Sequence, residues 1–161
     1  MIGRAGAPEW LQVRRLHVKL ALGLPLVVDV ELNEVLAAPD AHWRDFVANC
    51  AGAGDQALFV ARVGARCVGM GHVRRLGAEA RLAMLYVEPV HRRAGLASAL
   101  VGAQARWAAA GGPVHLAAYI PGVSAAGSLA SALGWHRTPE VFTTRHGLEE
   151  RRWTAPAPDA R

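Results

Sequence analysis

The apolar residues of this chain fall into short segments whose spacing changes between that of a helix and that of a strand. Near the start, the pattern predicts a short strand at Leu11–Leu16, followed by a helical stretch that Pro25 should end because proline cannot continue a helix. A further helix is predicted at Ala41–Ala51, where Asp40 can cap the first turn and the large apolar residues share one face. Helix is therefore expected to dominate the first third of the chain.

Strands dominate the rest of the chain, with two helices between them. The helix predicted at Ala94–Ala110 has a regular apolar face, and a shorter one follows Ser124 and ends at Gly134. An apolar run without alternation, ended by Pro89, is typical of a central strand covered on both faces. The predicted strands are Ala57–Val63, Arg66–Arg75, Leu82–Val87, Val114–Ile120, Trp135–Thr138 and Glu149–Thr154. This order predicts an α/β domain with a mixed sheet.

Length and composition are those of one ordinary domain. The chain has 161 residues, of which 52% are hydrophobic and 19% charged, and it lacks the apolar run of roughly 18 residues that a membrane span needs. We expect a domain at residues 10–154, with flexible tails at residues 1–9 and 155–161. Because we find no signal peptide, and because Cys50 and Cys67 lack metal or disulfide spacing, we expect a cytoplasmic protein without a metal.

A formal net charge of +5 raises the question of whether nucleic acid is a partner. Lys19 is the only lysine among many arginines, and we find neither a recognition helix nor a strand with interleaved aromatic and basic residues. We therefore do not expect nucleic acid to be the main partner. A positive surface would serve a small polyanionic ligand equally well.

The segment Val87–Leu100 joins the predicted central strand to the long helix through a basic turn that contains glycine. Such a junction can bind an anion, because the first N–H groups of a helix are unpaired and the helix dipole adds positive charge there. Gly95 leaves room for a phosphate, and the small side chain of Ala97 leaves space beside the first turn of the helix. Arg92 and Arg93 add cations. The sequence therefore predicts an anion site at this turn.

This segment resembles the central motif of the GNAT superfamily of acetyl-CoA-dependent N-acetyltransferases, V-x-P-x-x-[QR]-x-x-G-x-[GA]. The segment 133–135 is similar to the family's L-G-F, and the resemblance, closest to small bacterial members, covers about residues 10–154. It implies a mixed, mostly antiparallel sheet of six to seven strands flanked by about four helices. The positions that match the central motif are Val87, Pro89, Arg92, Gly95 and Ala97.

The resemblance also implies how acetyl-CoA would bind as co-substrate. Backbone amides of the turn would hold the pyrophosphate, and the strand edge at Leu85 and Val87 would pair with the pantetheine arm. The backbone N–H of Leu85 would polarise the thioester carbonyl. The cofactor-binding residues expected on this basis are Leu85, Tyr86, Val87, Arg92, Arg93, Ala94, Gly95, Leu96, Ala97 and Ser98.

The usual acid and base of the family are missing. Ala130 stands where many members have a tyrosine that protonates the departing thiolate, and Arg81 and Ala118 stand where others have a catalytic glutamate. Glu88, beside the turn, is expected to face solvent. The remaining catalytic candidates are Glu34, His72 and Ser131, with Ser128, Tyr119 or water as further proton donors. The residues expected to line the acceptor cleft are Glu31, Glu34 and Tyr119.

Three functions follow from these observations. The first is acetyl transfer from acetyl-CoA to a primary amine of a small molecule or a protein N-terminus, by direct attack in a ternary complex, since neither cysteine is placed as a nucleophile. The second is a GNAT-like domain that binds or senses acyl-CoA with little catalysis. The third is a basic RNA-associated protein, whose binding would depend steeply on salt. The sequence does not choose among acceptors, and a homodimer is expected from family habit.

Overall fold

Seven strands form one sheet in the computed structural model, which describes residues 1–161 except 24–27, 113, 123, 145–146 and 157–161. Their order across the sheet is β1-β2-β3-β4-β5-β7-β6. The strands are β1 (Ile2–Arg4), β2 (Gln56–Val63), β3 (Arg66–Leu76), β4 (Glu79–Val87), β5 (His115–Pro121), β6 (His136–Thr143) and β7 (Glu149–Thr154). The helices are α1 (Trp10–Leu22), α2 (Val28–Ala37), α3 (Asp40–Gly52), α4 (Leu96–Ala110) and α5 (Ala125–Ala132), with 3-10 turns at Ala7–Glu9 and Pro89–His91.

Neighbouring strands are antiparallel except for β4 and β5, which run parallel. The parallel pairing is short, from Glu79 opposite His115 to Leu82 opposite Ala118. The predicted α/β fold with a mixed, mostly antiparallel sheet is therefore confirmed. The described residues add α2 to the helices that the sequence predicted.

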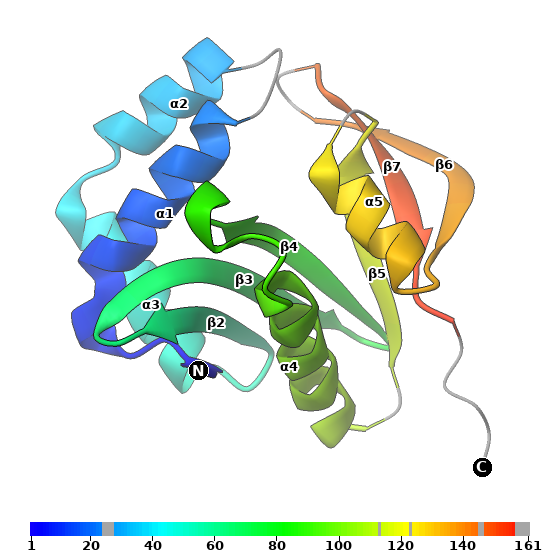
Figure 1. Cartoon of the computed structure of the whole chain (residues 1–161), viewed down its shortest axis with the longest axis horizontal. Coiled ribbons are helices and arrows are strands. Elements are labelled where there is room, and N and C mark those ends of the chain that lie inside the picture. The colour runs from blue at the N-terminus through cyan, green and yellow to red at the C-terminus, as the bar shows by residue number, and fades with distance from the viewer. Residues whose placement is uncertain (24–27, 113, 123, 145–146, 157–161) are drawn as a thin grey trace.

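Helices cover both faces of the β1–β4 half of the sheet, with α1 and α3 on one face and α4 on the other (Figure 1). Successive residues of β2 alternate between these layers, as side chains of a strand must. Leu58 and Val60 are buried against α1 and α3, whereas Ala57 and Phe59 are buried on the side of α4. In the other half of the sheet, α5 lies beside β5 (Figure 1).

Residues 10–22 form α1, so the predicted strand at Leu11–Leu16 is wrong. Val13 and Leu16 lie on one side of the helix and are fully buried, whereas Leu11 is 58% exposed. The helical spacing of the buried residues becomes clear only over more than one turn, and a six-residue window does not separate it from a strand.

The N-terminal residues, which we expected to form a flexible tail, belong to the sheet. β1 pairs antiparallel with β2, from Ile2 opposite Ala61 to Arg4 opposite Phe59. Ala5, directly after β1, is buried. A strand of three residues that includes a glycine has too little pattern to be predicted, yet its backbone covers the edge of β2.

The remaining elements agree with the sequence in kind and differ in extent. β6 continues to Thr143, beyond the predicted Trp135–Thr138. α3 and α5 lie where they were predicted, and α3 starts at Asp40, the residue expected to cap it. None of the helices in the described part of the chain is long and apolar enough to cross a membrane.

Candidate active site

β4 and β5 separate beyond the short stretch where they pair. The last paired residues are Leu82 and Ala118, yet β4 continues to Val87 and β5 to Pro121. Beyond this point, the edges that face each other carry backbone N–H and C=O groups outside the sheet ladder. Such edges can hydrogen-bond an extended ligand as an added strand.

A bulge in β4 lies where the two strands part. The register with β3 shifts between Met70 and His72, and there Met84 and Leu85 together face Gly71. Met84 has a φ of 54°, a left-handed conformation that is unfavourable for a residue with a side chain. An extra residue in a strand bends it and interrupts the regular ladder. The bulge therefore redirects the backbone near Leu85 at the start of the opening.

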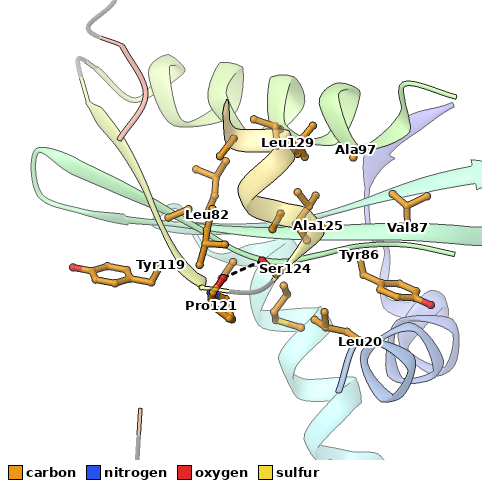
Figure 2. A pocket seen from close by; sticks show the side chains of 18 of the residues that line it. Leu20, Leu82, Tyr86, Val87, Ala97, Tyr119, Pro121, Ser124, Ala125 and Leu129 are labelled. Atoms are coloured by element: carbon orange, nitrogen blue, oxygen red, sulfur yellow. Dashed lines mark hydrogen bonds between the residues drawn. The ribbon is translucent and has the colours of Figure 1, made fainter. Parts of the chain in front are cut away.

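A cavity of about 650 Å³ occupies the space between the separated strands (Figure 2). Its walls come chiefly from α1, β4, α4, β5 and α5, and most of the lining side chains are apolar, such as Leu82 and Leu129. A mostly apolar cavity of this size with a few polar groups is typical of a small-molecule site. The polar residues that line it in the described part of the chain are His17, Tyr86, Arg92, Gln104, Tyr119, Ser124 and Glu150.

The connection from β4 to α4 forms a tight turn beside this cavity. Arg93 and Gly95 have φ values of 64° and 74°, so the helix starts at Leu96 and not at Ala94 as predicted. A Cβ on Gly95 would meet no atom within 4 Å, and Ala97 of the first helical turn lines the cavity. Open space in front of the first N–H groups of a long helix suits a phosphate.

Arg92 stands where the turn meets the end of β4. Its Nε donates to the backbone oxygen of Val87 at 2.9 Å, and its guanidinium carbon lies 5.9 Å from the ring centroid of Tyr86. These contacts hold a cation at the border between the cavity and the turn. A guanidinium has further N–H donors that an anion can use.

Comparison with known proteins agrees with this geometry. A family model for the acetyltransferase (GNAT) domain matches residues 54–137, which is more than half of the chain. The chain belongs to the GNAT acetyltransferase family. By class it is an acetyl-CoA-dependent N-acetyltransferase, and the predicted family is confirmed. A search of curated proteins finds no match.

Solved structures of GNAT proteins share the fold at low sequence identity. Ribosomal-protein-alanine N-acetyltransferase from Brucella melitensis has a TM-score of 0.77 and 16% identity, covering 96% of this chain and 98% of that one. PaiA N-acetyltransferase from Thermoplasma acidophilum, solved with coenzyme A, has a TM-score of 0.76 and 12% identity, covering 96% of this chain and 97% of that one. Phosphinothricin acetyltransferase from Sinorhizobium meliloti, solved with acetyl-CoA, has a TM-score of 0.76 and 16% identity, covering 98% of this chain and 88% of that one. At these identities the likeness shows the fold alone.

The residues predicted to bind acetyl-CoA lie along one path from the bulge to the helix. Leu96, Ala97 and Ser98 begin α4, and Arg93, Ala94 and Gly95 form the turn before it. None of the described residues between Pro89 and Ser98 is buried. The members of the predicted set that line the cavity are Leu85, Tyr86, Val87, Arg92 and Ala97.

Most of the predicted catalytic and acceptor-cleft residues lie elsewhere. Glu34 on α2 and Ser131 on α5 are exposed and do not line the cavity, whereas Tyr119 does. His72 on β3 also lies outside the lining, and burial lowers its pKa. The side chain of Glu31 lies outside the described residues. The weak catalytic candidates from the sequence are therefore not brought together.

The position of the family tyrosine is part of the cavity wall. Ala130 is buried and lines it. Tyr119 extends away from the cavity in Figure 2, and its hydroxyl donates to Oε1 of Glu140 at 3.0 Å. Burial and this hydrogen bond raise the pKa of Tyr119. The Oγ of Ser124 donates to the backbone oxygen of Pro121 at 3.2 Å (Figure 2). Neither hydroxyl is therefore an evident substitute for the tyrosine.

Glu88 is buried, so the expectation that it faces solvent is wrong. It is 2% exposed, and its carboxylate accepts hydrogen bonds from Nζ of Lys19 at 2.6 Å and Nη2 of Arg66 at 3.1 Å, with Arg15 at 3.8 Å. Burial acts to raise its pKa, but the hydrogen bonds and charges of these cations lower it overall. The cluster fastens α1 to the ends of β3 and β4.

Both cysteines are buried, as their positions in a helix and a strand indicated. Cys50 and Cys67 are free thiols, and burial raises the pKa of each to about 11. A thiol with so high a pKa is a poor nucleophile near neutral pH. Within the described ranges, no group of three or more metal-binding side chains is placed to hold an ion.

Four polar residues at the cavity were not predicted as site residues from the sequence: His17, Gln104, Ser124 and Glu150. Gln104 is fully buried, and its Nε2 donates to the backbone oxygen of His72 at 2.8 Å. His17 was missed because the strand predicted at Leu11–Leu16 ended directly before it, so that the single helix joining His17 and Leu20 to the preceding turns was not recognised. A helical assignment of α1 would have exposed that signal, whereas nothing near Glu150 in the sequence marks it as a site residue.

Proposed function

We propose that this protein transfers the acetyl group of acetyl-CoA to a primary amine of a small molecule or a protein N-terminus, within a ternary complex. The observation that carries this proposal is that the separated edge of β4, its bulge and the open turn before α4 border one cavity. The pantetheine arm, the thioester and the pyrophosphate of acetyl-CoA need these three features in that order.

The turn before α4 would hold the pyrophosphate. Its backbone N–H groups from Arg93 to Ala97 and the positive end of the helix dipole favour negative charge in the open space beside Gly95. Arg92 adds a fixed cation. The edge of β4 at Leu85 and Val87 would pair with the amides of the pantetheine arm, as an added strand does.

The bulge would supply the donor that the reaction needs. The N–H of Leu85 would donate to the thioester oxygen, on which negative charge develops as the amine attacks the carbonyl carbon. Removing one such donor costs about a hundredfold or more in rate. Backbone strain like that of Met84 is common at functional sites, which supports this role.

Direct attack fits the state of the thiols. The buried cysteines offer no activated nucleophile, so the amine would bond to the thioester carbon and displace CoA without a covalent enzyme intermediate. The thiolate of a thiol with a reference pKa of about 8.5 is a tolerable leaving group near neutral pH. The mechanism therefore tolerates alanine at position 130.

Isothermal titration with acetyl-CoA tests the proposed site. Gly95→Ala places a methyl group in the open space of the turn, and Gly77→Ala is the matched control. Gly77 also has a left-handed φ, 64°, and open space around it, but lies in the turn between β3 and β4. Wild type and Gly77→Ala should bind alike, and Gly95→Ala should lose about tenfold or more in affinity, which corresponds to about 1.4 kcal/mol.

Release of free thiol with a panel of primary amines then measures transfer. Equal affinity in both glycine variants would place the pyrophosphate elsewhere. No binding by the wild type at millimolar acetyl-CoA would contradict the proposed function. Binding without thiol release for any amine would favour the domain that only senses acyl-CoA.

A further inference from the structure

His17 places an imidazole in the wall of the cavity that also contains the bulge. His17 and Leu20 lie three residues apart on α1, Gly23 follows the end of the helix at the same interval, and all three line the cavity. Figure 2 shows Leu20, one turn further along the helix, among the lining side chains. Met84 and Leu85 line the same space. A nitrogen base therefore shares the cavity with the N–H proposed to hold the thioester oxygen.

The ring of His17 packs against Trp43 of α3. Their ring centroids are 5.1 Å apart with an interplanar angle of 62°, and Trp43 is 3% exposed. The Nδ1 atom of His17 is buried without a hydrogen-bond partner among the described residues. Nε2 of the same ring is not among the buried unpaired atoms of the described residues, and we therefore assign the lone pair of the neutral ring to Nε2 and the proton to Nδ1.

We propose that His17 is the catalytic residue that carries a proton from the acceptor amine to the departing thiol, a role that rests on the function proposed above. The neutral amine nitrogen bonds to the thioester carbon, and the carbonyl electrons move onto oxygen. Nε2 takes one proton from that nitrogen, the carbon–sulfur bond breaks, and the imidazolium gives its proton to the thiolate. The products are the acetylated amine and the free thiol of CoA, and His17 is neutral again.

The other polar groups at the cavity suit this transfer less well. Arg92 cannot accept a proton, and the hydroxyl of Tyr119 is engaged by Glu140. Tyr86 on β4 presents a phenol, and Glu150 on β7 presents a carboxylate, which is the competing proton carrier. Among these groups, only an imidazole is a neutral nitrogen base that becomes, once protonated, a cation able to return the proton.

The lowered pKa of His17 favours the delivery of a proton to the thiolate more than the uptake of a proton from the amine. Burial, and to a smaller degree the charge of His42 on the same α3 as Trp43, lowers the pKa of His17 to about 4. The ring is therefore neutral at pH 7 and can accept a proton. Once protonated, it is a much stronger acid than a thiol, whose reference pKa is about 8.5. His17 thereby takes over the proton delivery that a tyrosine at Ala130 would perform.

Chemical rescue separates this role from packing. His17→Ala leaves space for a small ring, and thiol release from acetyl-CoA is measured with hydroxylamine and with benzylamine as acceptors. We expect kcat to fall about a hundredfold, the lower end for a general acid–base group, with unchanged affinity for acetyl-CoA. Added imidazole should restore turnover, whereas pyrrole, a ring of the same shape without a basic nitrogen, should not. His115→Ala, at an exposed histidine outside the cavity lining, should behave as wild type.

The outcomes distinguish a wrong proton role for His17 from a wrong assignment of acetyl transfer. Turnover close to wild type in His17→Ala, or equal rescue by pyrrole, would overturn the proton role. Loss of turnover in Glu150→Gln while His17→Ala keeps it would assign the role to Glu150. A wild type that binds acetyl-CoA but releases thiol with no amine of the panel would contradict acetyl transfer itself. Independently of turnover, nitrogen-15 NMR at pH 7 should show the His17 proton on Nδ1, and a proton on Nε2 would overturn the assignment.

Discussion

At the scale of single residues, His17 should make the fold sensitive to mild acid. Its pKa is about 4 in the folded protein, because of burial and then of His42, against an ordinary value of 6.5 in the unfolded chain. Between these values only the unfolded chain binds the proton, so the free energy of unfolding falls as the pH falls from 6.5 to 4. The difference amounts to about 3 kcal/mol at most. His17→Phe should flatten this part of the stability profile, measured by urea unfolding across the range.

The exposed His115 provides the control for this experiment. His115→Phe, at an exposed position, should leave the shape of the stability profile as in the wild type, because the buried His17 is still present in this variant. If acid destabilisation between pH 6.5 and 4 persisted in His17→Phe, another group would have to be responsible.

Glu88 should affect the free energy of unfolding in a lower pH range than His17, and for a different reason. Burial acts to raise the pKa of Glu88, but its cations lower it below the ordinary value of 4.5 overall. The contribution of Glu88 to the free energy of unfolding is therefore present above pH 4.5 and is lost as the pH falls through the pKa of the folded protein. Glu88→Gln should cost about 2 kcal/mol at pH 7, less than for a fully buried pair because the cations are partly exposed. In thermal melts, the wild type and this variant should converge as the pH falls below 4.5. Asp55→Asn, which breaks an exposed pair with Arg74, should change stability by less than about 0.5 kcal/mol.

At the scale of elements, the bulge in β4 lies opposite Gly71 of β3. A Cβ there would lie 2.8 Å from Nε2 of Gln104, which is fully buried and bonded to the backbone oxygen of His72. Gly71→Ala should therefore cost about 1–3 kcal/mol in urea unfolding, as overpacking does, and lower kcat through a displaced bulge. Gly52→Ala, where a Cβ would meet nothing within 4 Å, is the control. Full activity together with lost stability would show that Gly71 supports packing alone.

The strand β1 gives a second prediction at this scale. Deletion of residues 2–5 removes the backbone pairs with β2 and the buried Ala5, so we expect a loss of about 2 kcal/mol or more and a sheet edge prone to association. Melting temperature and light scattering measure the two effects. Ile2→Ala keeps the backbone pairing and should show a small loss of stability without association. A deletion variant as stable as the wild type would restore the view of this segment as a tail.

The sequence predicted those elements whose signals are local, and the same holds for the site. α4 and the turn before it are contiguous and marked by glycine, so the residues proposed to hold acetyl-CoA could be predicted as one segment. The bulge at Met84 depends on the register between β3 and β4, which no pattern within β4 reveals. His17 and Glu150 line one cavity only because α1 and β7 both border it, and no local pattern in the sequence marks that arrangement.

At the scale of the whole molecule, the sheet is two parts joined by a short seam. β4 and β5 share four residue pairs, and the cavity opens where these pairs end. The two core clusters of buried residues lie mainly in the β1–β4 part. A ligand in the cavity would touch both parts, through β4 and α4 on one side and β5 and α5 on the other. Binding should therefore hold the two parts together.

Acetyl-CoA should stabilise the whole fold by an amount that its affinity fixes. At a concentration of 100 times Kd, binding to the folded state alone adds about 2.7 kcal/mol. For a domain of this size, that corresponds to a rise in Tm of roughly 5–10 °C. Hydrogen exchange should slow most at the end of β4, in the first turn of α4 and along β5, and least in β1 and α3, which do not line the cavity. At the same ligand concentration, a tenfold loss of affinity in Gly95→Ala should leave about 1.4 kcal/mol of this stabilisation, so the thermal shift should fall by about half and the protection should weaken with it. A thermal shift with protection elsewhere would mean that acetyl-CoA stabilises the protein from a site other than the opening between β4 and β5.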